Sequence, residues 1–195
     1  MHVLTVLDHP DPNSFTRAAA EAFGAGAEAA GHQVELDDLH AEGFDPRWSV
    51  PDLAQFEDQP MPNDVLAEQA KIDRADVVCM VFPLFWWGMP AMSKGWIDRV
   101  WSWGWAYDQV DAPDISLQRP RTGVFLVPAG AAPDSMSKYD YDKAVKAIWL
   151  TGTMGYLGFK RKQVEVLHGS TGSEERRKGL LDRAWRIGHD LQPPE

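Results

Sequence analysis

The chain of 195 residues has a single cysteine, Cys79, so an internal disulfide is impossible and a cysteine-rich zinc site is excluded. It also has no surplus of positive charge, because 19 Lys and Arg residues stand against 29 Asp and Glu residues, a net charge of −10. This balance argues against a nucleic-acid partner and against docking on an anionic membrane surface. No run approaches the roughly 18 consecutive apolar residues of a transmembrane helix, so no membrane insertion is expected.

Motifs for chemistry carried by the protein itself are also missing. The six histidines have no metal-ligand spacing and no Gly-x-Ser-x-Gly segment is present, so we expect neither a metal site nor a nucleophilic serine. Asp37 and Asp38 are interpreted as solvated charge, and Cys79, inside an apolar run, as a core residue. Because the sequence carries so few motifs for chemistry of its own, we expect a bound cofactor to supply that chemistry. Residues 1–7 lack a basic leader, which predicts a cytoplasmic protein.

Short apolar runs alternate with longer segments of helical periodicity. We predict one domain over residues 1–195, with strands at 3–7, 33–39, 77–82, 122–127 and 163–167, and helices near 14–30, 63–75, 90–100, 141–153 and 172–191. Such alternation implies right-handed crossovers and a parallel sheet with helices on both faces. Five units in this length favour an α/β fold of the flavodoxin-like kind, a doubly wound five-stranded sheet in the order 2-1-3-4-5.

Several helix starts carry capping signals. Asn63 or Asp64 is expected to cap the second helix, Pro90 fits the first turn of the third, and Thr171-x-x-Glu174 is a possible capping box for the last. Two long connections are expected to be irregular, at residues 41–62 and 108–121.

Ligands of open α/β sheets bind beyond the carboxyl ends of the strands, which here means the loops 8–14, 83–88 and 128–134. The first loop ends in Asn13-Ser14-Phe15-Thr16 at a helix start, where free N–H groups and the helix dipole favour an anion. Ser14, Thr16 and His9 could add donors to a phosphate. The alternative is that Asn13 or Ser14 is only an N-cap and His9 only a loop residue.

The second loop is rich in aromatic residues, and six of the nine tryptophans fall between Trp86 and Trp105. Pro83-Leu84-Phe85-Trp86-Trp87-Gly88 follows the most apolar strand, so its rings could form a wall for a planar ligand. They could equally pack into the core or a subunit interface. The third loop, Pro128-Ala129-Gly130-Ala131, is small enough for close backbone approach to a ligand, or it is only a tight turn.

Together these residues resemble the NAD(P)H:quinone oxidoreductase family of flavodoxin-like flavoproteins. This is the DT-diaphorase-like group, which includes modulator of drug activity B and the ancillary subunits of potassium-efflux systems. The resemblance covers roughly residues 3–159. It is carried by Phe82-Pro83-Leu84-x-Trp86-x-x-x-Pro90-Ala91, by the stretches 67–76, 94–100 and 104–107, and by the opening His9-x-x-x-x-Ser14-Phe15.

The resemblance implies a bound flavin, FAD or alternatively FMN, with NAD(P)H as co-substrate. It implies that the flavin phosphate and ribityl groups are held by His9, Ser14, Phe15 and Thr16, and that the isoalloxazine is lined by Pro83, Leu84, Phe85 and Trp86. Trp86 and Trp87 match an aromatic pair beside the flavin where nicotinamide and quinone stack in turn. Tyr107 matches a tyrosine that reaches the other subunit's active site, which implies a homodimer.

The third loop departs from the family pattern. Family members usually read Thr-Thr-Gly-Gly where this chain has Val127-Pro128-Ala129-Gly130, and Pro128 has no N–H to donate. The backbone N–H groups of Gly130 and Ala131 are therefore the candidates for the flavin N1–O2 edge. No tyrosine stands at the spacing of the family's proton-relay tyrosine, and Tyr139 and Tyr141 are the nearby substitutes.

The predicted function is a flavin-dependent NAD(P)H:quinone oxidoreductase that works by ping-pong hydride transfer through flavin N5. Its acceptor is a quinone or a similar flat aromatic molecule. One alternative is a flavin-binding regulatory subunit of a potassium-efflux-type transporter. Another is a flavodoxin-like electron carrier, against which the aromatic wall argues, because a carrier needs an exposed flavin edge.

Overall fold

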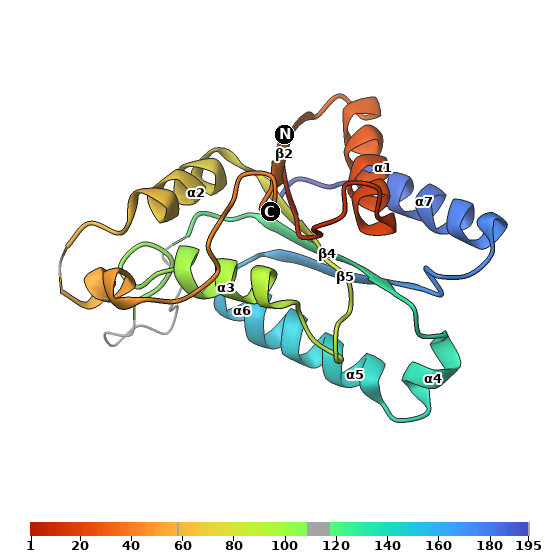
Figure 1. Cartoon of the computed structure of the whole chain (residues 1–195). Coiled ribbons are helices and arrows are strands. Elements are labelled where there is room, and N and C mark those ends of the chain that lie inside the picture. The colour runs from red at the N-terminus through yellow and green to blue at the C-terminus, as the bar shows by residue number, and fades with distance from the viewer. Residues whose placement is uncertain (58, 109–117, 195) are drawn as a thin grey trace.

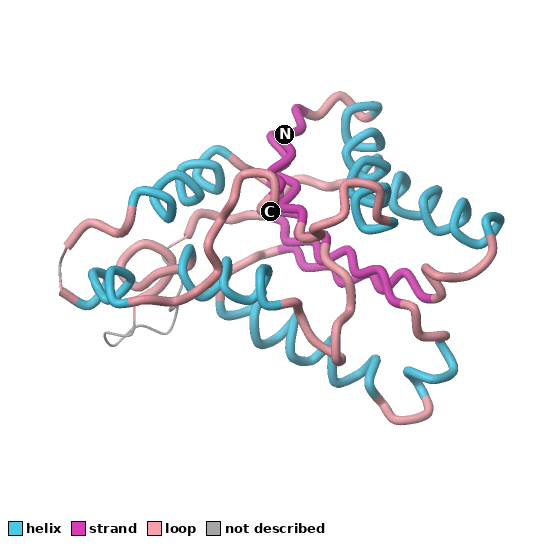
Figure 2. The backbone as a smooth tube through the Cα atoms, in the orientation of Figure 1, coloured by secondary structure: helices cyan, strands magenta, loops and turns pink. Residues whose placement is uncertain are grey.

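The computed structural model describes residues 1–57, 59–108 and 118–194, and its centre is a five-stranded parallel sheet. The strand order is β2-β1-β3-β4-β5, as predicted, and helices flank the strands on both sides (Figure 2). The central strand β3 is buried along its whole length, because its Val-Val-Cys-Met-Val sequence is covered on both faces. The strands are β1 (His2–Leu7), β2 (Gln33–Asp38), β3 (Val77–Val81), β4 (Thr122–Ala129) and β5 (Arg161–His168).

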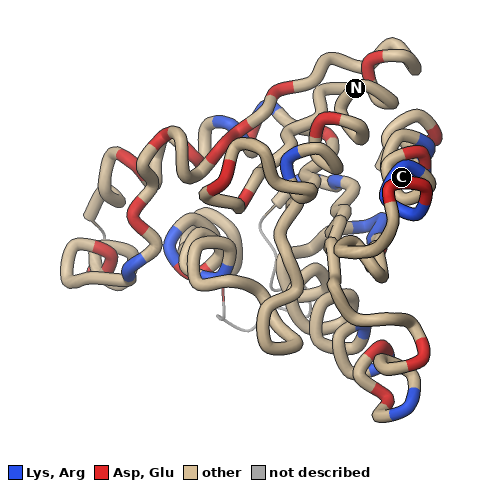
Figure 3. Tube along the Cα trace, turned by 45° about the vertical axis from the view of Figure 1, so that its right-hand side comes forward, with Lys and Arg blue, Asp and Glu red and all other residues tan. Residues whose placement is uncertain are grey.

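The helices form two layers over the sheet. The α-helices are α1 (Phe15–Ala29), α2 (Asn63–Arg74), α3 (Ala91–Val100), α4 (Pro133–Ser137), α5 (Tyr141–Lys146), α6 (Met154–Tyr156) and α7 (Glu174–His189). Helices α1 and α7 lie together on one side, and α2, α3, α5 and α6 lie on the other (Figure 1). Acidic and basic positions are interleaved along the helix near the C-terminus (Figure 3). No helix in the described ranges has the length and apolarity that crossing a bilayer requires.

Each face of the sheet has its own apolar core. The core under α1 and α7 includes Val3, Phe23 and Leu167, together with Cys79 as predicted. The core on the opposite face is aromatic, and Trp96 and Phe82 are fully buried at its centre. Edge-to-face contacts join Phe82 to Trp149, with ring centroids 5.5 Å apart. Several of the tryptophans are therefore core residues.

Glycines bring α1 and α7 into direct backbone contact. A Cβ atom on Gly188 would lie 2.0 Å from the carbonyl oxygen of Phe23, and one on Gly26 would lie 2.0 Å from the carbonyl oxygen of Trp185. No side chain fits at such distances, so each helix must present a glycine to the other. Through this contact the first helix of the fold packs directly against the last.

Three predicted helix starts are wrong in detail. The cap of α2 is Pro62 and not Asn63 or Asp64, and Pro90 caps α3 from just outside its first turn. Ser173 caps α7 by accepting a 3.3 Å hydrogen bond from the Arg176 N–H, so Thr171 and Glu174 form no capping box there. Serine is a strong N-cap in its own right, so it displaces the cap two residues upstream.

Two segments are more ordered than predicted. Residues 41–62 contain a 3-10 helix, η1 (Val50–Phe56), and the predicted helix 141–153 is α5 followed by a π-helical turn, η2 (Ala147–Thr153), that runs into α6. Helix α4 was not predicted, and most of the predicted loop 108–121 lies outside the described residues.

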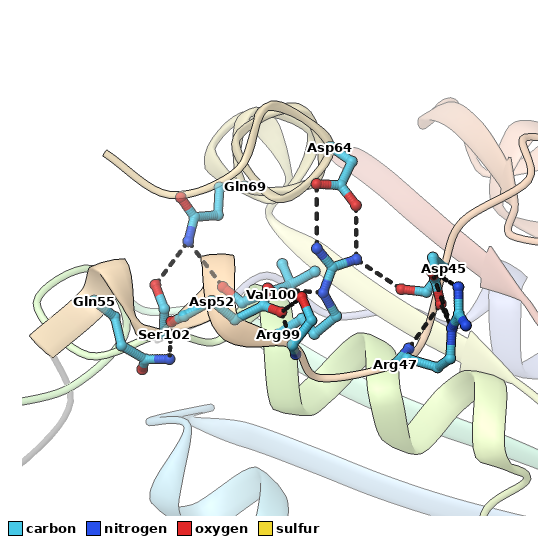
Figure 4. A network of polar contacts seen from close by, with 10 residues as sticks. Asp45, Arg47, Asp52, Gln55, Asp64, Gln69, Arg99, Val100 and Ser102 are labelled. Carbon is cyan, nitrogen blue, oxygen red and sulfur yellow. Dashed lines mark hydrogen bonds and ion pairs between the residues drawn. The ribbon is translucent and has the colours of Figure 1, made fainter. Parts of the chain in front are cut away.

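Buried ion pairs fix the 41–62 segment to the scaffold. The Arg99 guanidinium donates to Asp52 at 2.8 Å, to Asp64 at 2.6 Å and to the Asp45 carbonyl at 2.6 Å (Figure 4). Gln69 donates to the Val100 carbonyl oxygen at 2.9 Å beside this group. One arginine on α3 thus joins α2, η1 and the preceding loop.

Candidate active site at the carboxyl edge of the sheet

The loop after β3 is a tight turn that displays two tryptophans. Phe85 and Gly88 exchange backbone hydrogen bonds of 3.1 and 2.9 Å, and Trp86 and Trp87 between them have φ of 48° and 63°. Two successive left-handed residues define a type I′ turn, a conformation that glycine or asparagine usually adopts. Holding two tryptophans there costs on the order of 1–3 kcal/mol for each residue. Such strain at a sheet edge is typical of functional sites.

This turn forms one wall of a cavity whose other wall is the loop after β4. The cavity has a volume of about 300 Å³ and is lined by Leu84, Trp86, Trp87, Ala129, Gly130 and Ala131. The Leu84 N–H donates to the Pro128 carbonyl at 2.8 Å, which fixes the two walls relative to each other. The structure therefore brings the second and third predicted loops into one slot, as their shared sheet edge requires. We call this cavity the slot.

The rim of the slot is aromatic and open to solvent. Trp86 is 97% exposed and Phe85 is 52% exposed, so the core explanation for these two rings is wrong. Trp87 stacks on Tyr141 with ring centroids 4.1 Å apart and an interplanar angle of 24°. Tyr139 lies 5.6 Å from Tyr141. Both predicted substitutes for the relay tyrosine therefore lie beside the slot.

Tyr107 lies elsewhere in the described structure. Its ring meets Tyr156 of α6 at 5.2 Å, and it is not among the residues that line the slot. Burial and the neighbouring Tyr156 raise the pKa of the Tyr107 phenol, so the hydroxyl is neutral at physiological pH. Its predicted role in a second subunit's site remains a prediction.

The first predicted loop has well-defined structural roles. The Ser14 side chain caps α1 by accepting a 3.1 Å hydrogen bond from the Arg17 N–H, and His9 Nδ1 accepts one of 3.1 Å from the Asp11 N–H. Thr16 is buried, and Phe15 lies under the Arg177 guanidinium. None of these residues lines the slot. They lie on the neighbouring loop of the same sheet edge, where the first-turn N–H groups of α1 point away from the helix.

The third loop begins later than predicted. Pro128 and Ala129 belong to β4 and pair with Leu167 and His168 of β5. The pairing of β3 with β4 stops at Leu126, so Pro128 needs no N–H on that side. The Ala129 carbonyl accepts hydrogen bonds from Gly169 at 2.8 Å and from Ser170 at 3.0 Å. Strand β5 therefore holds the floor of the slot.

Asp8 is a structural residue that the sequence reasoning missed. It is buried directly after β1, where its carboxylate accepts a 2.8 Å hydrogen bond from the Ser93 N–H in the first turn of α3. Its other oxygen lies 2.9 Å from His40 Nε2. A negative charge at a helix N-terminus is favourable. The available signal was an acidic residue at a strand end where the chain turns over the sheet.

The prediction that Asp37 is solvated is wrong. Asp37 is buried, and Lys71 Nζ lies 2.8 Å from its carboxylate, 2.8 Å from Glu68 and 2.7 Å from Glu42. Asp38 instead pairs with Arg17. The three carboxylates of Asp37, Glu42 and Glu68 are close enough to hold a metal ion, but the Lys71 ammonium already bonds to all three.

Burial and the adjacent Glu68 carboxylate raise the pKa of Asp37 to about 8. Its Oδ2 is buried and has no hydrogen-bond donor. A proton on Asp37 resolves both facts, because the protonated group can donate to Glu68. Trp96 Nε1 completes the group with a 2.8 Å bond to the other Glu68 oxygen.

The fold and this slot define a flavodoxin-like α/β protein with an aromatic-walled site, and comparison with known proteins agrees. The family described as having a flavodoxin-like fold matches residues 1–187. A solved NAD(P)H:quinone oxidoreductase from Methanothermobacter marburgensis is similar, with a TM-score of 0.89 and 32% identity over 98% of this chain and 99% of that one.

Curated relatives cover most of the chain. One is an uncharacterized NAD(P)H oxidoreductase from Haemophilus influenzae, 29% identical over 85% of this chain and 83% of its own. Another is human ribosyldihydronicotinamide dehydrogenase [quinone], 28% identical over 94% of this chain and 88% of its own. The chain belongs to the flavodoxin-like family that contains these oxidoreductases, and the predicted family and fold are confirmed.

Proposed function

We propose that the protein is a flavin-dependent NAD(P)H:quinone oxidoreductase. The observation that carries the proposal is the slot, in which a strained pair of tryptophans faces the small backbone loop Ala129–Ala131 across about 300 Å³. Its aromatic rim suits planar rings. The names of the relatives, which are NAD(P)H and quinone oxidoreductases, point to the same chemistry.

The residues at the sheet edge fit a flavin. Gly130 and Ala131 present small, partly exposed backbone on the floor of the slot, and the N–H groups of Phe15 and Thr16 begin a 15-residue helix on the neighbouring loop. A helix N-terminus suits a phosphate, and backbone donors suit the polar edge of an isoalloxazine. When bound, the flavin supplies two-electron hydride chemistry that no side chain here possesses. We propose FAD as the flavin, with FMN as the alternative.

The protein's own part in the reaction is to orient and shield the flat reactants. Trp87, braced by Tyr141, offers one face for stacking, and the Ala129–Ala131 loop limits the approach from the opposite side. One such slot accommodates the nicotinamide and then the acceptor in turn, which supports a ping-pong cycle.

We also propose a homodimer in the cytoplasm. The highly exposed Trp86 and Phe85 form an apolar rim that a second subunit could cover, and NAD(P)H is a cytoplasmic reductant. Light scattering of the purified protein measures the first of these directly, and a mass of one chain would contradict it.

The experiment that tests the function is an absorbance scan followed by anaerobic addition of NADH or NADPH. We expect flavin bands that bleach and then recover when a quinone is added. Chromatography of the released cofactor distinguishes FAD from FMN. A protein that neither contains nor takes up flavin would contradict the proposal, and bound flavin that does not bleach would favour a regulatory or carrier role.

A further inference from the structure

Two buried polar atoms without partners belong to residues that line the same small cavity. His168 ends β5, and its Nδ1 is buried with no hydrogen-bond partner. Asp142 in the first turn of α5 has its Oδ1 in the same state. Both residues line a cavity of about 270 Å³ between β5, α4 and α5. A ring nitrogen and a carboxylate oxygen are complementary, and buried polar atoms rarely lack partners without a reason.

The cavity is large enough to hold water between the two groups. One water molecule occupies about 30 Å³ of liquid volume, so several fit, and each needs polar partners such as these. Ser137 and Lys146 add further polar groups to the lining. Water in this cavity would give the unpartnered atoms of both His168 and Asp142 a hydrogen-bond partner.

The residue that carries the imidazole lies beside a residue of the slot. His168 pairs with Ala129 across β4 and β5, and Ala129 lines the slot. The next residue, Gly169, donates to the Ala131 carbonyl at 3.2 Å and to the Ala129 carbonyl at 2.8 Å. The end of β5 is thus tied to the loop proposed to meet the flavin edge. The titratable residue His168 is therefore next to the slot in the sheet.

We propose that His168, paired with Asp142 through cavity water, holds and delivers the proton that each turnover of the slot consumes. This role rests on the proposed function. Reduction of a quinone to a hydroquinone takes two electrons and two protons. NAD(P)H supplies the two electrons and one proton as hydride. The remaining proton comes from solvent: His168 takes it up through the water beside Asp142 when negative charge arrives in the slot, and then gives it to the reduced acceptor.

The charges around His168 suit a group that is neutral at rest. Burial is the largest influence and lowers the pKa of His168, and Arg183 of α7 acts in the same direction. Glu165 of β5 and Asp142 of α5 act against it. Lys146 of α5 and Asp134 of α4 also line the cavity. Negative charge arriving in the slot would favour protonation of the imidazole.

The first test is an NMR titration of the histidine rings, which needs neither flavin nor substrate. In wild-type protein the pKa of the His168 ring should lie below the usual value of an imidazole. In Asp142→Asn its titration should move to still lower pH, because the variant lacks the carboxylate charge. A His168 titration that does not change in Asp142→Asn overturns the pair.

The second test is the pH profile of quinone reduction by flavin-loaded protein. His168→Gln should lower kcat by at least about tenfold and remove the inflection assigned to the imidazole, with flavin affinity unchanged. The matched control is His189→Gln at the end of α7, whose ring stacks on Trp185 and lies outside this cavity. Its kcat and profile should equal those of the wild type.

The outcomes separate the two proposals. An active His168→Gln protein with the wild-type kcat and pH profile overturns the proton role and leaves the reductase function standing. A wild-type protein that takes up flavin but reduces no quinone with NADH or NADPH overturns the proposed function, and the proton role with it. Circular dichroism and flavin affinity of both variants distinguish loss of chemistry from loss of fold.

Discussion

The two ends of helix α3 differ in burial and in backbone strain. At its C-terminal end, Arg99 is buried and bonded to two carboxylates and a carbonyl (Figure 4). The loop that leads into its N-terminal end exposes Trp86 and strains two residues into the left-handed region. Arg99 thus anchors the scaffold, while the strained and exposed tryptophans mark the site. His168 and Asp142 have buried atoms without partners in a separate cavity.

Removing the Arg99 guanidinium at the C-terminal end of α3 should have the largest effect on the stability of the fold. Arg99→Met leaves Asp52, which has no exposed side-chain surface, as an unpaired buried charge. We expect a loss of about 3–5 kcal/mol in the free energy of unfolding, measured in urea. Arg47→Met is the control, because the Arg47–Asp45 pair is exposed to solvent and its loss should change the free energy of unfolding far less. Equal losses in the two variants would contradict the contrast.

The contact between α1 and α7 should be nearly as sensitive. Gly188→Ala forces a methyl group against the Phe23 carbonyl, and we expect about 1–3 kcal/mol of destabilisation despite alanine's better helix propensity. Gly179→Ala, on the same helix, meets nothing within 4 Å and should stabilise by about 0.5–1 kcal/mol. Thermal unfolding measures the change in stability of both variants. Changes of the same sign would show that the two helices do not touch at Gly188.

The buried pair of carboxyl groups, Asp37 and Glu68, should make the free energy of unfolding depend on pH. Because the pKa of Asp37 is raised to about 8 in the folded state, folding takes up a proton at this site. Its contribution is complete below the unfolded pKa of about 4 and is lost as the pH rises towards 8. The free energy of unfolding should therefore fall as the pH rises across that range, as measured by urea titrations. Asp37→Asn should flatten this part of the profile, and a variant with the wild-type slope would refute the assignment.

Substitutions in the slot should leave the fold intact but impair the function. Trp87→Ala removes the ring that stacks on Tyr141, and we expect KM for NAD(P)H or quinone to rise roughly tenfold with flavin affinity nearly unchanged. Trp48→Ala, at a half-exposed tryptophan of the 41–62 segment, is the control. Wild-type steady-state kinetics for a flavin-loaded Trp87→Ala protein would exclude the stacking role.

The sequence predicted the architecture well because periodicity and burial decide it. The apolar run 77–82 could only be a central strand, and the alternation of elements defined the sheet order. The ends of elements were less accurate, because caps compete over a few tenths of a kcal/mol to about 1 kcal/mol. Ser173 and Pro62 took positions that the pattern had assigned to their neighbours.

The site was predictable only where it lies in consecutive residues. The second and third loops met as expected, because parallel strands end at one edge. Asp37 was misassigned because its partners, Glu68 and Lys71, come from a helix about thirty residues later. His168 gave no sequence signal either, since its significance depends on a cavity shared with Asp142.

The glycine contact between α1 and α7 also constrains how the chain can be made. Phe23 emerges from a ribosome long before Gly188, its partner on α7. Part of the apolar core on this face of the sheet therefore stays uncovered until α7 has been synthesised. A truncated or stalled product would expose that face, so such chains should depend on chaperones far more than the finished protein does.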